Sequence, residues 1–268
     1  MKKYLSFFAM RFYAGLQYRT AVAGAVVTQI PWALMECLAY RTFQEANPSA
    51  FPMELSAVVS YMWLKEAFFL LFTVWGNVDQ DLFDMILKGD IAYELCRPVS
   101  LYQMWFAKVS AARIANAALR CMPILFAGLL LPVPFRLLPP RDLQTFLLFL
   151  AALALGTGVT VSFCMLVYLA AFFTISPQGL RLFFMSVVEF LSGSIIPIPF
   201  MPDTVRHIVE LLPFAAMMNV PYRIYSGDLA GQAMIRALGL QVFWFAVMLA
   251  AGKWLCAMAE QKIIIQGG

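Results

Sequence analysis

Residues 143–173 read LQTFLLFLAALALGTGVTVSFCMLVYLAAFF and contain no charged side chain. A helix needs about 20 residues to cross the roughly 30 Å hydrocarbon core of a bilayer, at about 1.5 Å per residue. This run is therefore long enough to span a membrane. Its continuous apolarity, without alternation between polar and apolar positions, favours a helix over a strand of a membrane barrel.

The rest of the chain is nearly as apolar as this run. Hydrophobic residues make up 62% of the 268 residues, charged residues make up 13%, and the mean hydropathy is +0.78. Soluble domains are about half apolar and a quarter charged, so the bilayer is the expected solvent for most of this surface. The net charge of +4 fits basic cytoplasmic edges. It does not suggest a nucleic-acid-binding protein, in which basic residues cluster on one face.

We expect one all-α integral membrane domain over residues 1–268, with six transmembrane helices. They are expected over residues 21–43, 55–78, 109–131, 143–173, 180–196 and 235–257, the fifth being the shortest. Residues 1–19, MKKYLSFFAMRFYAGLQYR, mix aromatic and basic side chains at helical spacing, which predicts an amphipathic helix in the membrane interface. If both termini lie inside, the inside segments hold more Lys and Arg than the outside ones, which favours cytoplasmic termini.

Signatures of several enzyme classes are missing from the chain. The only Gly-Lys pair, at Gly252, is followed by Trp254 and not by Ser or Thr, so there is no phosphate-binding P-loop. His207 is the single histidine, which excludes a two-His metal site within one chain. No Gly-x-Ser-x-Gly nucleophile motif occurs. We therefore expect no catalytic residue, metal or cofactor in this chain.

A polar stretch separates the second and third expected spans. Residues 79–88 read DQDLFDMILK and residues 88–100 read KGDIAYELCRPVS. Acids at the front and a lysine at the end suit the dipole of a short helix, Gly89 is suited to end it, and the proline disfavours helix at Arg97. A short helix that is both apolar and acidic is suited to docking in a groove of a partner, although a loop on the membrane surface is the alternative.

The order of these segments resembles the membrane subunits of type-2 ABC exporters. It is closest to a bacterial subgroup with a Gly-acid…Leu-x-Arg-Pro-Val-Ser loop after the second span. That loop is Gly-Asp-Ile-Ala-Tyr-Glu-Leu-Cys-Arg-Pro-Val-Ser here, and the resemblance extends over nearly the whole chain. In the family, the segment corresponding to residues 79–98 is the coupling helix, which sits in a cleft of a separate P-loop ATPase. The resemblance implies ATPase contact by Asp79, Asp81, Phe83, Asp84, Ile86, Lys88, Asp90, Glu94, Arg97 and Pro98.

The resemblance also implies the partners and the setting of the chain. Two permease subunits, alike or unlike, would assemble with two ATPase subunits that bind ATP and Mg²⁺. The complex would sit in the bacterial cytoplasmic (inner) membrane and export an amphipathic or hydrophobic substrate, such as a peptide, lipid, glycan or drug. Two other functions stay open from the residues: a membrane-embedded enzyme acting on lipids through Glu66, Glu189 or Asp203, and an ion-coupled carrier using buried charges.

Residues 192–227 contain repeated helix breaks. Five prolines interrupt this segment, at Pro197, Pro199, Pro202, Pro213 and Pro221, and a spanning helix does not tolerate that density. Short apolar helices with breaks predict a re-entrant or interfacial hairpin, provided that protein covers the free backbone groups; a long loop lying on the bilayer is the alternative. The exporter family has such a hairpin between its fifth and sixth spans, so the resemblance implies a role in closing the outer mouth.

Five charged residues fall within the expected spans: Lys65, Glu66, Arg113, Arg120 and Glu189. Each costs at least about 2.5 kcal/mol at the bilayer centre, so we expect them to face the bundle or one another. They either form structural ion pairs or line a substrate path. One hypothesis pairs Arg120 with Glu66 or with Glu189.

Overall fold

The computed structural model describes residues 2–17, 19–73, 77–88, 90–96, 98–174 and 177–262. Within these ranges every regular element is helical, which confirms the all-α class. Three helices of the described part are long and apolar enough to cross a membrane. They are α7 (Leu101–Leu130), α8 (Leu143–Ala170), which continues into η2 (Ala171–Phe173), and α12 (Gly231–Lys262).

The helix α8 is formed by the most apolar run of the sequence. Its N-terminus is capped by the side chain of Asp142. The carboxylate of Asp142 accepts a hydrogen bond of 2.6 Å from the backbone N–H of Thr145. An N-cap of this kind satisfies a donor that has no partner within the helix. The same hydrogen bond holds the pKa of the Asp142 carboxyl below its usual range.

The other three expected spans differ from α7, α8 and α12. The first corresponds to α2 (Arg19–Ala46), a helix of 28 residues with Pro31 inside it. The second is broken into α3 (Leu55–Ala67) and α4 (Phe69–Phe72), so a single helix over residues 55–78 is wrong. The fifth corresponds to α9 (Pro177–Leu191), whose 15 residues reach only about 22 Å.

The break in the second expected span has a partner that stabilises it. The backbone carbonyl of Thr73, just after α4, accepts a hydrogen bond from the guanidinium of Arg113, which is 5% exposed in α7. The same guanidinium donates to the sulfur of Cys164 in α8 at 3.3 Å. A cation at the C-terminal end of a helix satisfies carbonyls that have no partner within that helix. Arg113 therefore joins α4, α7 and α8 and allows the chain to leave the helix inside the bundle.

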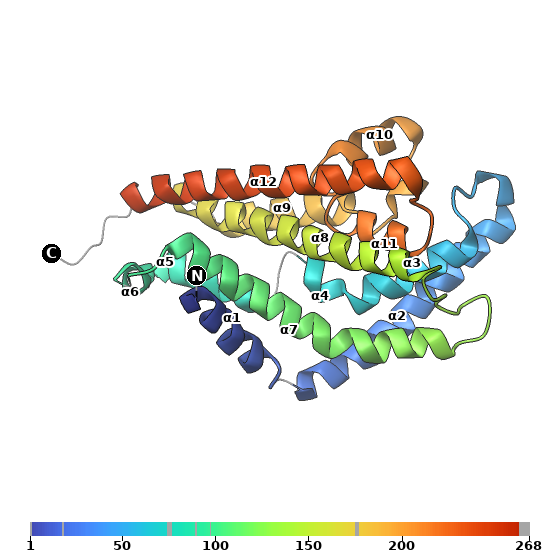
Figure 1. Ribbon diagram of the computed structural model, residues 1–268, viewed down its shortest axis with the longest axis horizontal. Coiled ribbons are helices and arrows are strands. Elements are labelled where there is room, and N and C mark those ends of the chain that lie inside the picture. The colour runs from blue at the N-terminus through green and yellow to red at the C-terminus, as the bar shows by residue number, and fades with distance from the viewer. Residues whose placement is uncertain are drawn as a thin grey trace.

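Most of the long helices run lengthwise through the molecule, and two short helices lie at one of its ends (Figure 1). From the end that carries α5 (Asn77–Lys88) and α6 (Ile91–Leu95), α7 runs away, α8 returns, α9 runs away and α12 returns. The N-terminal helix α1 (Lys2–Gly15) lies along the first half of α7, where a Cβ on Gly15 would be 2.8 Å from that of Ala115. The end of α12 and the start of α1 thus share the end that carries α5 and α6.

The proline-rich segment forms short helices instead of a long one. Between η3 (Ile198–Phe200) and α12 lie α10 (Asp203–Leu211) and α11 (Asn219–Tyr225). The turn before α11 and α11 itself are buried, and α11 packs on α8 and α3. The ring of Tyr222, fully buried, meets Tyr61 and Phe72 edge to face at 5.3 and 5.8 Å. A remaining short helix, η1 (Pro48–Ala50), follows α2.

The buried turn before α11 is held by the side chain of Gln241 in α12. Its amide Nε2 donates to the carbonyl of Ala216 in the turn at 2.8 Å and to that of Ala152 in α8 at 3.1 Å. Because Gln241 is fully buried, no water takes over this role when the amide is lost. We expect Gln241→Leu to destabilise the chain by about 1–3 kcal/mol, seen as a lower unfolding temperature in mild detergent. Gln232→Leu, at an exposed site of the same helix, is the matched control and should change little; equal shifts in the two variants would contradict this role.

Candidate functional site

The first candidate site is the segment formed by α5 and α6, which lies at one end of the bundle (Figure 1). One face of α5 is anchored in the core by Leu82 and Phe83, which are 0% and 3% exposed. The ring of Phe83 meets Tyr168 near the end of α8 edge to face, with 5.3 Å between ring centroids. A movement of α5 would therefore be transmitted directly to α8.

The opposite face of α5 is mainly polar and at least partly exposed. It carries Gln80, Asp81, Asp84, Leu87 and Lys88, which recur at the spacing of one helix face. The Lys88 ammonium lies 3.9 Å from the Asp84 carboxylate, and both side chains are substantially exposed. An ion pair of this kind contributes little to stability. The five residues are here called the outer face of α5; one of them, Gln80, accepts a hydrogen bond from the Arg181 guanidinium of α9.

The neighbouring helix α6 and the chain that follows it are tied to two other helices. The Glu94 carboxylate of α6 accepts a hydrogen bond from the indole of Trp105 in α7. The Lys3 ammonium of α1 donates to the carbonyl of Pro98 at 3.0 Å, and the Tyr4 hydroxyl accepts from the backbone N–H of Ser100 at 3.0 Å. The side chain of Tyr93 in α6 is 77% exposed beside this anchored region. The segment is thus firmly connected to α1 and α7, while its outer side is largely exposed.

The residues expected to contact an ATPase occupy different environments. Asp81, Asp84, Lys88, Asp90 and Pro98 lie at least partly at the surface, whereas Phe83 is buried and Ile86 is half-buried. Phe83 and Ile86 therefore anchor α5 instead of facing a partner. Glu94 binds Trp105 and keeps part of its surface accessible. Asp79 belongs to α5 but its side chain, like the whole of Arg97, lies outside the described residues.

A second candidate site is a cluster of buried charges between α2 and α3. The Lys65 ammonium, 4% exposed as a residue, pairs with the Glu36 carboxylate and lies 3.7 Å from that of Glu66. It also donates to the carbonyl of Ser194, after α9, at 3.2 Å. Sequence reasoning missed Glu36, although an acid within the first apolar run was a sufficient signal. The second carboxylate oxygen of Glu36 is buried and has no hydrogen-bond partner within the described residues.

The two arginines and Glu189 are placed apart from this cluster. Arg113 serves the end of α4, as described above. Arg120 forms no ion pair with Glu66 or Glu189 in the described structure, so the hypothesis that pairs them is not supported. Glu66 is instead next to Lys65, one residue away in α3.

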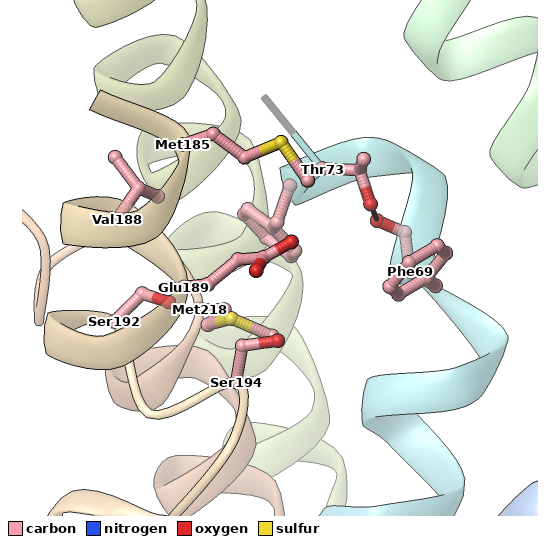
Figure 2. Close-up of a pocket in the computed structure, with 9 residues that line it drawn as sticks. Phe69, Thr73, Met185, Val188, Glu189, Ser192, Ser194 and Met218 are labelled. Atoms are coloured by element: carbon pink, nitrogen blue, oxygen red, sulfur yellow. Dashed lines mark hydrogen bonds between the residues drawn. The ribbon is translucent and has the colours of Figure 1, made fainter. Parts of the chain in front are cut away.

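The Glu189 side chain points into a cleft between α9 and α4. Figure 2 shows its carboxylate directed away from α9, between the thioethers of Met185 and Met218. The lining also includes Phe69, Phe72, Thr73, Val188, Ser192 and Ser194, and the empty volume is about 330 Å³, part of it open at the mouth. The Thr73 hydroxyl donates to the carbonyl of Phe69 at 2.7 Å and is thus occupied. The carboxylate forms no ion pair or hydrogen bond within the part of the chain that the structure describes.

The prolines expected in the outer hairpin mark the ends of its short helices. Pro197 and Pro199 are buried at η3, Pro202 is exposed as the N-cap of α10, and Pro213 is buried just after α10. The Arg223 guanidinium of α11 links the elements, at 2.7 Å from the Glu210 carboxylate and 2.5 Å from that of Asp228. This network holds α10 against α11 without a continuous helix.

Comparison with known proteins adds no relative to this description. No protein-family model matches the chain, and no curated protein matches it.

Proposed function

We propose that this chain is the membrane (permease) subunit of an ATP-driven exporter of the type-2 ABC kind. The observation that supports the proposal is the two-faced character of α5. Its inner face is buried in the bundle, while its outer face carries Asp81 and Asp84 at the surface. A segment that is anchored on one side and chemically open on the other is suited to transmit force from a docked partner. Hydrolysis of ATP, with Mg²⁺, would take place in that partner, because this chain has no P-loop.

The proposed coupling runs through named contacts. When the ATPase subunits close on ATP they would displace the outer face of α5, and Phe83 would pass the displacement to Tyr168 in α8. The bond between Glu94 and Trp105 would carry it to α7. Since α7 and α8 are two of the helices long and apolar enough to cross a membrane, their shift would change access to a substrate path.

The topology that goes with this proposal has six crossings and cytoplasmic termini. The second crossing would be made by α3 with α4 and the fifth by α9, which is shorter than a bilayer and exposes Leu182, Phe183 and Phe190. The hairpin of α10 and α11 would re-enter the outer leaflet, where α8 and α3 cover α11. The helix α1, with Leu5, Met10 and Tyr13 exposed beside basic residues, would lie in the inner interface of a bacterial cytoplasmic membrane.

Co-purification tests the docking role of the outer face of α5. We expect the chain, extracted in mild detergent from its host, to bring down an ATPase with a P-loop. A variant with Asp81→Lys and Asp84→Lys should lose more than about tenfold of that ATPase, because reversing charges in an interface is strongly unfavourable. The partner is identified and quantified by mass spectrometry of the eluate.

The matched control makes the same change of charge at the other end of the molecule. Glu45→Lys with Asp203→Lys alters two exposed acids, one near the end of α2 and one in α10. This control should retain the ATPase. Recovery of intact, monodisperse chain without any ATPase in several detergents would refute the exporter assignment, and equal losses in both double variants would refute the docking role of α5.

A further inference from the structure

The Glu189 cleft holds a carboxylate without a cation in the middle of an apolar chain. An acid in a membrane helix is costly unless it is paired, and those that persist face a pathway or a partner. Here the acid lies on α9 and is directed into a cleft lined by helices of the same subunit (Figure 2). Within the described residues nothing neutralises it, so the cleft is prepared for a positive group from outside.

Two cations donate hydrogen bonds to residues that line the cleft, but both are engaged elsewhere. Ser194, which lines the cleft, also accepts from Lys65, and this ammonium is shared by Glu36 and Glu66. Arg113 approaches the cleft through the Thr73 carbonyl. Both bases are engaged by other groups, so neither serves as the partner of Glu189.

The lining indicates which kind of cation fits. Hard ions such as Mg²⁺ and Ca²⁺ need a shell of six or more oxygen ligands, whereas this lining offers one carboxylate and a few hydroxyls among apolar groups. The rings of Phe69 and Phe72 and the thioethers of Met185 and Met218 suit a polarisable, weakly hydrated organic cation. Flexible methionines also adapt to ligands of varied shape.

We propose that the cleft between α4 and α9 binds the cationic group of an amphipathic organic cation, with Glu189 as its counter-ion. Because the cleft is open at its mouth and Glu189 is half-buried, a quaternary ammonium group can approach the carboxylate from outside while its apolar body lies over the rim. That this ligand is the exported cargo rests on the proposed function. Binding itself does not, because all the groups that it needs belong to this chain.

Ligand binding to the purified full chain in mild detergent tests the cleft. The probe is phenyltrimethylammonium, which neither titrates nor donates a hydrogen bond, titrated by saturation-transfer NMR. We expect saturable binding, a Kd raised at least about tenfold by Glu189→Gln, and a Kd within about threefold of the parent for Glu189→Asp, which keeps the charge. Benzenesulfonate, of similar size and opposite charge, should not compete.

Two further variants secure the result. Glu45→Gln removes a carboxylate at the exposed end of α2 and should leave the Kd unchanged. Met185→Lys places a cation beside Glu189 and should abolish binding, which keeps the test decisive where Glu189→Gln fails to fold. An unchanged Kd in folded Glu189→Gln, competition by benzenesulfonate, or displacement of the probe by Mn²⁺ or Ag⁺ would each overturn the proposal. No ATPase is present in this binding assay. A negative result would therefore overturn the cleft proposal without bearing on the exporter proposal, which the co-purification tests separately.

Discussion

Replacing Gly156 by valine is expected to abolish correct folding of the chain. A Cβ at this position of α8 would overlap the backbone carbonyl oxygen of Met217, in the buried turn before α11, and would lie 3.3 Å from that of Ala216. A backbone carbonyl cannot turn aside as a flexible side chain does, so the turn has to leave α8. It would then lose the hydrogen bond from Gln241 to Ala216 as well. We expect a cost of more than about 3 kcal/mol and little monodisperse protein on size-exclusion chromatography in detergent.

A second helical glycine provides the control for this expectation. A Cβ on Gly239 in α12 meets nothing within 4 Å, so Gly239→Ala adds a methyl group in open space. Alanine is the better helix former by about 1 kcal/mol, and this variant should be as stable as the parent or slightly more so. Gly156→Ala, with the smallest possible Cβ, should already lower the unfolding temperature. A folded Gly156→Val variant with an unchanged unfolding temperature would contradict the packing of the turn on α8.

The long helices were the part of the fold that the sequence could predict. The span expected at 143–173 matches α8 with η2, and the span expected at 235–257 lies within α12. A continuously apolar run of this length can cross a bilayer only as a helix, because its backbone groups must be paired within the segment. The third span was expected to begin at residue 109, but α7 begins at Leu101. Lys108 was expected to lie outside the span because it is charged, but it is part of α7 and only 8% exposed. The burial of a single charged residue cannot be seen in the sequence.

Interruptions caused by tertiary contacts could not be predicted. Residues 64–72 read LKEAFFLLF and contain neither Gly nor Pro, yet the helix breaks at Phe68 and ends before Thr73. The partner that permits this ending, Arg113, is 40 residues away in the sequence. The prolines of residues 192–227 did predict short helices there, because their effect on the backbone is local. The burial of α11 against α8 and α3 again depends on distant residues.

In the candidate sites, too, features that depend on nearby residues could be predicted, and features that depend on distant residues could not. The acidic character of α5 could be predicted, since it follows from composition. Which residues face inward could not: Phe83 was expected at the partner surface and is buried against Tyr168. The partner of Lys65 was missed because Glu36 lies in another expected span, and pairing between spans has no signal in a single sequence.

Replacing Lys65 by methionine is expected to be nearly as damaging as the change at Gly156. The ammonium is the one cation paired with both Glu36 and Glu66 in the described structure, and its side chain is 5% exposed. Removing it leaves two carboxylates uncompensated in an apolar bundle and frees the carbonyl of Ser194. Loss of one partner of a buried pair typically costs about 3–5 kcal/mol. We expect a strongly lowered unfolding temperature and poor recovery from the membrane.

Neutralising the acids should restore much of what Lys65→Met removes. With Glu36→Gln and Glu66→Gln added, no buried charge is left unpaired, and a neutral set of similar volume is often as stable as the ionic one. The surface pair of Arg41 and Glu45, at 2.8 Å and with both side chains more than 40% exposed, is the control: Arg41→Met should cost about 0.5 kcal/mol or less. If the triple variant were no more stable than Lys65→Met alone, Lys65 would act through its packing and its bond to Ser194, and the charge balance of the cluster would not be what holds α2 against α3.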